Sequence, residues 1–529
     1  MTEHRTDAQK LARSAGSVGV AVFLSRIMGV VREQVFAWLF GAGMAADAFV
    51  VAFRIPNLLR DLFAEGALSS AFVTVFTDYE KNRSAEDLKR LVNNVFTVMG
   101  VVVALVVTIE MLFSWELVQL MAQDFKHVVG KIELTTLLTL IMAPFLLFVS
   151  QAAIAMGILN TKGLFFIPAF SSACFNIGSI VVGAGLAMIL PHFGINGIIG
   201  MAIGTLAGGI MQFLIQVPLL KKQGFHIKPA WNLTESGLRR IFRLMVPAII
   251  GLSATQINIF VNTNFASQCA EGSVAWLNYA FRFMLFPIGL FGVAMSVASM
   301  PSISRMAASK DMERLKGLLH SSLILCLGLA IPASVGLFLL AEPIIRLIYE
   351  HGRFVHHDTI MTAQALELYA IGLTAYAGVK IIAPVFYALN DTRWPVVGSF
   401  LAVVFNILFI LVTLRHLEHR SIALATSISA TANLMLLMGI LHKKIGGFQW
   451  KKLGIAACKM GIASIGMGIV VWLTKNDLHG YGFWRQGLGL MASIVLGALF
   501  YTTAIYVLNV PELKVVIAGI GRRLMGSAS

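Results

Sequence analysis

Fourteen stretches of mostly apolar residues, each about as long as a membrane-spanning helix, run through this chain of 529 residues. A helix needs about 20 consecutive, mainly apolar residues to cross the hydrocarbon core of a bilayer. Hydrophobic residues make up 57% of the chain and charged residues only 13%. Because no water-soluble fold can bury that much apolar surface, a soluble enzyme, a disordered chain and a nucleic-acid-binding protein are excluded. We predict an all-α polytopic membrane protein with fourteen transmembrane helices, near residues 17–41, 46–78, 88–113, 133–159, 164–190, 195–220, 238–266, 274–301, 315–341, 359–389, 395–414, 421–441, 453–474 and 486–508. Pro56 and Gly66 are expected to break or bend the second of them.

The distribution of Lys and Arg among the connecting segments predicts the orientation of the chain. With both termini in the cytoplasm, the cytoplasmic segments carry 26 of these residues, and the opposite loops carry 8, including Lys126 and Lys131. Cytoplasmic loops of membrane proteins are enriched in Lys and Arg. We therefore expect both termini in the cytoplasm, and the same enrichment accounts for most of the net charge of +15.

Two halves of the chain resemble each other at an offset of 227–230 residues. The matching pairs are Ala52–Arg54 with Ala280–Arg282, Leu88–Lys89 with Leu315–Lys316, Leu159–Asn160 with Leu389–Asn390, and Phe175–Ile177 with Phe405–Ile407. Each repeat holds six helices, so both have the same orientation, and we expect a pseudo-two-fold axis along the membrane normal with a binding site at the shared interface, as in transporters. The predicted domains are an N-lobe at 1–230, a C-lobe at 231–450, and two additional helices with a cytoplasmic tail at 451–529.

Six basic residues lie within or beside the predicted helices, where lipid would surround an ordinary side chain. They are Arg26, Arg32, Arg54, Arg60, Arg282 and Lys380. A charge at the centre of the bilayer costs about 2.5–3.5 kcal/mol even on a lenient insertion scale. These side chains must therefore line a wet cavity or pair with acids, and the nearby acids are Glu33, Asp47, Asp61 and Glu65.

Two interpretations of these charges remain open. In the first, ion pairs fix the first two helices together and have no other role. In the second, the arginines line a water-filled cavity with surplus positive charge, and their planar guanidinium groups favour a phosphate-bearing anion. Because most of the six basic residues lie in the first repeat, that repeat would bind the head group.

Other polar residues in this sequence have a simpler structural interpretation. Glu110 and Glu367 lie in apolar stretches, where each is either a proton-coupling site or, more simply, a carboxyl group that is paired or stands at a helix end. The histidines and the aspartate in 351–358 are interpreted as a solvated outer loop. The sequence has no phosphate-binding P-loop and no HExxH motif, so we expect neither ATP hydrolysis nor a metal site or cofactor within this chain.

Several motifs resemble those of one family, the MurJ (MviN) lipid II flippases. They are Ser25–Glu33 (SRIMGVVRE), Phe40–Gly43 (FGAG), Asp47–Phe49, Pro56–Arg60 (PNLLR), Phe63–Ala67 (FAEGA) and Tyr279–Pro287 (YAFRFMLFP). The resemblance covers nearly the whole chain and is most specific in the first 70 residues. The family belongs to the multidrug/oligosaccharidyl-lipid/polysaccharide exporter superfamily.

The resemblance implies a role for individual residues. The essential arginines of the family correspond to Arg26, Arg32, Arg60 and Arg282, its functional acids to Asp47 and Glu65, and its first-helix serine to Ser25. Arg54 stands where members carry a basic residue, and Glu33 stands where relatives often have Asp. Phe281 and Leu285 replace acids that some members carry around the eighth-helix arginine. The carboxylates of a sodium site in the seventh and eleventh helices also have no counterpart here.

The expected function is therefore that of a flippase in the bacterial inner membrane. It would move the undecaprenyl-diphosphate-linked peptidoglycan precursor, lipid II, from the cytoplasmic to the outer leaflet by alternating access, for cell-wall synthesis. The alternative is an exporter of the same superfamily that carries another polyprenyl-diphosphate-linked glycan or drugs. A membrane-embedded enzyme acting on a polyprenyl phosphate is the rival from a different class. Lipid II and membrane lipids are the expected partners, and nucleic acid is not.

Overall fold

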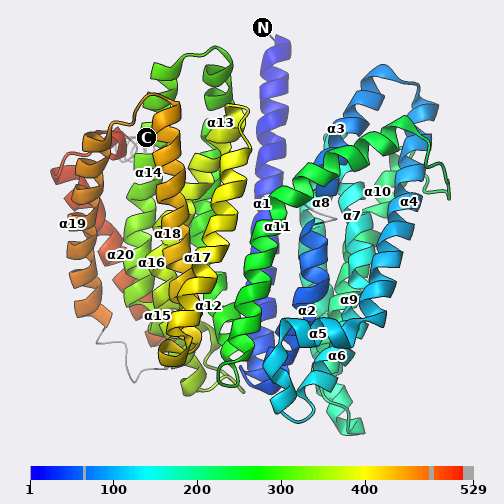
Figure 1. The fold of residues 1–529 in the computed structure, drawn as a ribbon, viewed down its shortest axis with the longest axis horizontal. Coiled ribbons are helices and arrows are strands. Elements are labelled where there is room, and N and C mark those ends of the chain that lie inside the picture. The colour runs from blue at the N-terminus through cyan, green and yellow to red at the C-terminus, as the bar shows by residue number, and fades with distance from the viewer. Residues whose placement is uncertain (1, 63–66, 476–481, 516–529) are drawn as a thin grey trace. The chain divides into compact units, whose positions relative to one another are not determined.

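The computed structural model describes residues 2–62, 67–475 and 482–515, with side chains from residue 19 onward. Within these ranges the regular structure is helical, and no strand occurs (Figure 1). Twelve helices or consecutive helix pairs of the described part are long and apolar enough to cross a membrane. They coincide with twelve of the fourteen predicted segments, and the helices at Thr2–Phe40, Met44–Arg60 and Ala67–Asn82 cover the other two.

The second predicted segment is two helices, α2 (Met44–Arg60) and α3 (Ala67–Asn82). Pro56 lies inside α2, and the helix continues for another turn beyond it. Helix α2 is therefore not broken at Pro56, the predicted bend there stays a prediction, and Gly66 lies outside the described residues.

The chain divides into two compact units. The first consists of Met1–Gly272 together with His351–Phe354, and the second consists of Ser273–Glu350 and Val355–Ser529. The boundary at Gly272 lies after the predicted lobe boundary at residue 230, because the helix Ser236–Ser267 packs against α3 and the helix Ala85–Leu112 of the first unit. The predicted division into two six-helix lobes and two additional helices stays a prediction.

In the first unit, the helix Phe166–Ile189 (α8) packs along both the N-terminal helix α1 and the helix Ile198–Leu214 (α9). Small residues allow the α8–α9 approach: a Cβ atom on Gly204 would lie 2.4 Å from the Cα atom of Gly183. The helices of this unit are α1 (Thr2–Phe40), α2, α3, α4 (Ala85–Leu112), α5 (Ser114–Met121), η2 (Gln123–His127), α6 (Lys131–Met142), α7 (Phe145–Thr161), α8, η3 (Leu190–Phe193), α9, α10 (Val217–Lys222) and α11 (Ser236–Ser267).

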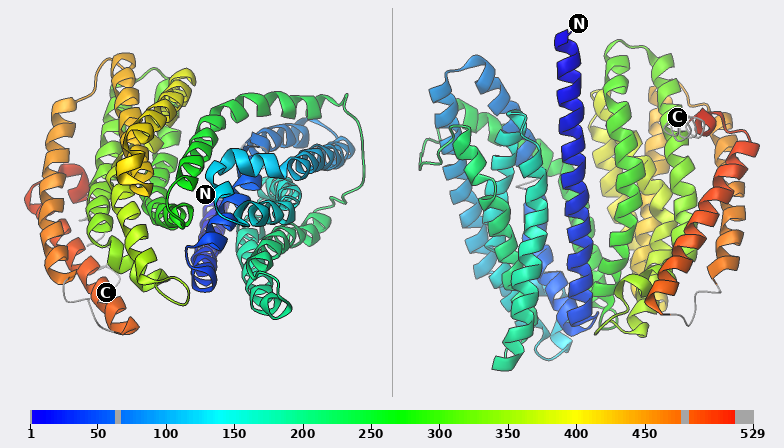
Figure 2. Two further views of the ribbon diagram at one scale, coloured as in Figure 1. Left: turned by 60° about the horizontal axis from the view of Figure 1, so that its bottom comes forward. Right: turned by 180° about the vertical axis from the view of Figure 1, so that it is seen from behind.

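In the second unit, one apolar core joins the long helices, and the last two helices lie side by side in Figures 1 and 2. A π-helical turn, η4 (Ile288–Val293), interrupts the eighth predicted segment and divides it into α12 (Ser273–Pro287) and α13 (Ala294–Ala308). The other helices are α14 (Met312–Leu339), α15 (Ala341–Tyr349), α16 (His356–Ala388), α17 (Arg393–Leu417), α18 (His419–Lys444), α19 (Trp450–Lys475) and α20 (Phe483–Val507).

Candidate functional site

Helix α1 carries the first group of predicted site residues. Ser25 and Arg32 are seven residues apart, as are Arg26 and Glu33, so each pair lies about two turns apart on one side of the helix. The side chain of Arg26 is exposed. Arg32 donates from Nη2 to Oε1 of Glu33 at 2.8 Å, and its Cζ atom lies 5.3 Å from the ring centre of Phe175 on α8. Helix α1 thus carries two guanidinium groups, those of Arg26 and Arg32, within about two turns of each other.

The C-terminal half of α2 carries the second group. Arg54 is half-buried, and Arg60 donates from Nε and Nη2 to Oδ1 of Asp61, at 3.3 and 3.0 Å. Nε2 of Gln256 lies 3.4 Å from the other oxygen of Asp61. The Arg32–Glu33 and Arg60–Asp61 pairs join neighbours in the sequence, so neither pair itself links α1 to α2. Glu65, the remaining predicted acid, lies outside the described residues.

Asp47, near the start of α2, lies in a different environment from the arginines. Its Oδ2 atom accepts from Nζ of Lys131 at 2.8 Å and from the backbone N–H of Gly272 at 2.8 Å. Asp47 is 1% exposed and Lys131 2% exposed, and the Lys131 ammonium lies 4.1 Å from the ring centre of Phe125. The assignment of Lys131 to an outer loop is therefore wrong: it is the first residue of α6 and forms a buried ion pair.

The turn between α1 and α2 is packed closely against a segment distant in sequence. Arg353 donates its backbone N–H to the carbonyl of Trp38 at 3.0 Å. Gly41 has φ +61°, and a Cβ atom there would lie 2.4 Å from the carbonyl oxygen of Arg353. Gly352 has φ +63° and equally little space against Trp38. The segment His351–Phe354 is therefore an integral part of the first unit.

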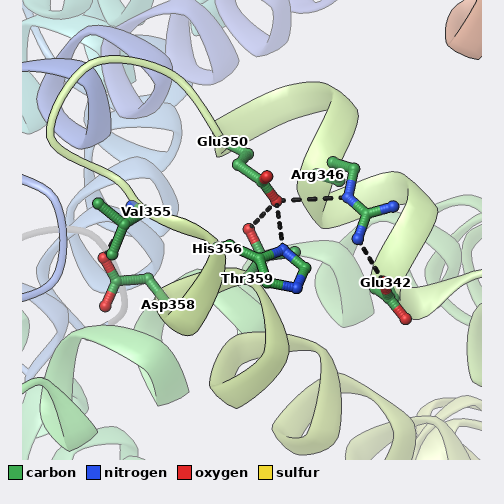
Figure 3. Close-up of polar contacts among 7 residues, drawn as sticks. All are labelled: Glu342, Arg346, Glu350, Val355, His356, Asp358 and Thr359. Atoms are coloured by element: carbon green, nitrogen blue, oxygen red, sulfur yellow. Dashed lines mark hydrogen bonds and ion pairs between the residues drawn. The ribbon is translucent and has the colours of Figure 1, made fainter. Parts of the chain in front are cut away.

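The residues that flank this segment in the sequence form a polar network in the second unit (Figure 3). Oε2 of Glu350 accepts from Oγ1 of Thr359 at 2.7 Å and lies 3.4 Å from both Nε of Arg346 and Nδ1 of His356. Burial acts to raise the pKa of the Glu350 carboxyl, but these hydrogen bonds and the positive charge of Arg346 together lower it. The carboxylate form therefore fixes the end of α15 to the start of α16.

Asp358 corrects the interpretation of 351–358 as a solvated loop. Its side chain is buried, and its two oxygens accept from Nε1 of Trp276 at 3.0 Å and from the backbone N–H of Val355 at 3.1 Å. His356 and His357 are exposed, as that interpretation requires. Asp358 thus stabilises the N-terminus of α16 and joins it to α12.

Arg282 is exposed on α12, six residues before the start of the π-helical segment. The preceding Phe281 packs edge-on against Tyr369 at a centroid distance of 5.3 Å, and Leu285 is exposed. Lys380 on α16 is also exposed. π-helical turns occur frequently at functional sites.

Three further observations concern the remaining acids and the possible metal ligands among the described residues. Glu110 on α4 is 2% exposed, and neither of its carboxyl oxygens has a hydrogen-bond partner in the described part of the chain. No three His, Cys, Asp or Glu side chains come together there as a metal-ion site. Glu367, the second carboxyl group in an apolar stretch, is only half-buried.

An apolar pocket of about 560 Å³ lies in the second unit, between α14, α16 and α19. Apart from Ser334 and Gly468, its lining is apolar, with Trp472 at one side. A site of this composition suits a hydrocarbon ligand rather than a charged one.

Comparison with known proteins gives a consistent result over nearly the whole chain. The family model described as lipid II flippase MurJ matches residues 36–488. The probable lipid II flippase MurJ of Haemophilus influenzae is 33% identical over 92% of this chain and 98% of its own length. The lipid II flippase MurJ of Burkholderia cenocepacia is 33% identical over 94% of this chain and 98% of its own length.

Solved structures agree with the sequence relatives. A lipid II flippase MurJ in an inward closed conformation matches with a TM-score of 0.77 at 28% identity, over 93% of this chain and 99% of that one. An inward-facing multidrug transporter of the MATE family matches with a TM-score of 0.67 at 13% identity, over 81% of this chain and 98% of that one. At that identity, the second match establishes a shared fold alone.

Proposed function

Because this chain belongs to the MurJ family of lipid II flippases, we propose that it moves lipid II from the cytoplasmic to the outer leaflet of the bacterial inner membrane. The chain is a transporter and a multi-pass membrane protein. The observation that carries the proposal is the family match over residues 36–488. Delivery of lipid II to the outer leaflet supplies the precursor for cell-wall synthesis.

The arginines bind the diphosphate of lipid II in this proposal. A guanidinium group offers a rigid fork of N–H donors that matches two phosphate oxygens at once. Arg26 and Arg32 on α1 and Arg54 and Arg60 on α2 supply this chemistry in the first unit, with Ser25 as an additional hydroxyl donor. Arg282 on α12 is also proposed to bind diphosphate. In support, the side chains of Arg26 and Arg282 are exposed, although Arg282 lies in the candidate membrane span Ser273–Ala308 and Arg26 lies in the first segment predicted to cross the membrane.

The experiment measures lipid II export and protein abundance together for Arg26→Ala and Arg282→Ala. We expect both variants to accumulate normally and to lose export, and the lysine variants to recover it only in part, since lysine keeps the charge but lacks the fork. Arg305→Ala is the matched control, because Arg305 is exposed on α13 and belongs to no predicted site. Normal export by either alanine variant would contradict the diphosphate proposal. Low abundance that recovers when a neighbouring acid is also neutralised would favour a purely structural ion pair.

The orientation proposed is that both termini, residues 221–243 and residues 443–452 face the cytoplasm. Lys and Arg counted over the loops support it. Single cysteines placed near residues 226 and 447 in a cysteine-free background test it with a membrane-impermeant thiol reagent. Protection in intact cells and labelling after permeabilisation is the expected result, and labelling in intact cells would overturn the orientation.

The polyprenyl tail of lipid II is proposed to run along the apolar pocket bordered by α19. The apolar lining of the pocket, which includes Ile465 and Ile469, supports a hydrocarbon ligand there. The variant Ile469→Trp fills the pocket and is expected to slow export. Ile462→Trp is the matched control, since Ile462 is exposed on the same helix and does not line the pocket. Equal export rates for the two variants would argue against a tail in this pocket.

A further inference from the structure

Helix α8 holds the arginine-bearing part of α1 through two adjacent residues. The ring of Phe175 lies beneath the guanidinium group of Arg32, with a distance of 5.3 Å from Cζ to the ring centre. Nδ2 of Asn176 donates to the backbone carbonyl of Ser25 at 3.2 Å and to the carbonyl of Ser172, one turn earlier in α8, at 3.1 Å. One dipeptide therefore contacts α1 at two points about two turns apart.

The ring of Phe175 is itself fixed from behind. It packs at 5.4 Å from the ring centre of Phe145 on α7. Gly208 on α9 is so close that an added Cβ atom would lie 2.9 Å from Cδ2 of Phe175, and one on Gly209 would lie 2.6 Å from Cδ2 of Phe145. Phe175 is 9% exposed, so the ring is a rigid platform rather than a mobile side chain.

Such a platform restricts the cation above it. An aromatic face attracts a guanidinium group by about 0.5–2 kcal/mol, depending on how far both are removed from water. Glu33 contacts one end of the same guanidinium through Nη2. Together, the ring below and the carboxylate at one side fix the plane of the Arg32 guanidinium, and this plane determines which phosphate oxygens its fork can reach.

The second repeat contains the same residues in different surroundings. Phe405 on α17 corresponds to Phe175, but it is 51% exposed. The sequence motif is thus shared by both repeats, whereas the buried ring beneath an arginine is a property of the first. The burial of Phe175 beneath Arg32 therefore distinguishes it from Phe405, its counterpart in the second repeat.

We infer that Phe175 is a positioning residue for the proposed transport reaction, and that it orients Arg32 for bidentate contact with the diphosphate of lipid II. This inference rests on the proposed function, because it assigns a role to Arg32 at the same site. Asn176 supports the arrangement by holding the α1 backbone at Ser25. Phe175 makes no contact with the substrate itself.

The test is a double-mutant cycle between Phe175 and Arg32, with binding of lipid II to the purified protein as the readout. Phe175→Leu keeps an apolar side chain and removes the aromatic face, and we expect lipid II affinity to fall about two- to thirty-fold. Phe175→Tyr keeps the face and is expected to retain most of the affinity. Phe72→Leu is the matched control, because it removes an even more deeply buried ring, one that packs with Phe76 in the same unit and contacts no arginine in the described pairs.

The cycle separates positioning from general destabilisation. In an Arg32→Ala background, Phe175→Leu should cause no further loss, because the ring acts only through the arginine. A further loss of the same size as in the wild type would overturn the inference, as would equal effects of Phe175→Leu and Phe72→Leu. If Arg32→Ala alone leaves lipid II affinity unchanged, the diphosphate assignment of Arg32 fails. If Arg32→Ala abolishes lipid II binding, while Phe175→Leu alone leaves the affinity at the wild-type value, only the positioning role fails.

Discussion

We expect that breaking the buried ion pair between Asp47 and Lys131 lowers the free energy of unfolding strongly, and that removing both charges restores most of it. Lys131→Met removes the ammonium and leaves the Asp47 carboxylate buried, where it still accepts from the backbone N–H of Gly272. Removing one partner of a buried ion pair costs about 3–5 kcal/mol, because the other charge stays uncompensated. Asp47→Asn should fall at the lower end of this range, since the amide oxygen can still accept from Lys131 and the Phe125 ring still faces the ammonium at 4.1 Å.

The double variant Asp47→Asn/Lys131→Met removes both charges at once. We expect it to regain most of the lost stability, because replacing a whole buried pair by uncharged groups of similar size is often nearly neutral. The free energy of unfolding would be measured by denaturant titration in detergent, followed by tryptophan fluorescence. Arg240→Met is the matched control, since Arg240 pairs with Asp78 at 2.6 Å but both side chains are substantially exposed. If Lys131→Met is no more destabilising than Arg240→Met, or if the double variant is as unstable as the singles together, the assignment of a buried charge pair is wrong.

Three further predictions concern other parts of the chain. Gly41→Ala should lower the abundance of folded protein far more than Gly163→Ala, because both positions have positive φ but only Gly41 lacks space for a Cβ atom; equal abundance on a fluorescence-tagged gel filtration profile would contradict this. Glu110→Gln should leave thermal stability and export almost unchanged, since the two side chains are nearly equal in size and neither carboxyl oxygen has a hydrogen-bond partner to lose among the described residues. A marked loss of either would show that the carboxyl group is used. Burial raises the pKa of the Glu235 carboxyl in the folded protein, despite the hydrogen bond from Asn94. The contribution of Glu235 to the free energy of unfolding is therefore fully present below its unfolded-state pKa, and it is lost as the pH rises through its folded-state pKa. Unfolding followed across that interval should therefore show a smaller decline for Glu235→Gln than for the wild type, and an unchanged decline would assign the pH dependence to another group.

The sequence was sufficient to predict the helices because each one carries its own signal. An apolar stretch such as 395–414 needs no partner to be identified, and the corresponding helix α17 extends it by only a few residues at either end. The repeat was also legible, because Phe175 and Phe405 stand in equivalent stretches. What the repeat could not indicate is that one ring is buried beneath an arginine while the other is exposed.

Contacts between distant residues account for what the sequence did not predict. Lys131 follows a polar stretch and looks like a loop residue, and nothing in its neighbourhood indicates a partner 84 positions earlier. Asp47 was named as one possible partner of the nearby arginines, and its contact with Lys131 was not anticipated for the same reason. Asp358 was misassigned because a cluster of histidines around it resembles an exposed loop. In each case tertiary packing determined burial, and hydropathy alone cannot report it.

The segment His351–Phe354 has a consequence for the order in which this protein can be made. The first unit contains residues up to Gly272, yet its last four residues emerge only after all of Ser273–Glu350 has been synthesised. Until then, the backbone of Trp38 and the space beside Gly41 lack the segment His351–Phe354, which packs against them. A fragment ending at Gly272 would thus lack part of the first unit. The first unit cannot reach its final packing during synthesis until the ribosome has added residues 351–354.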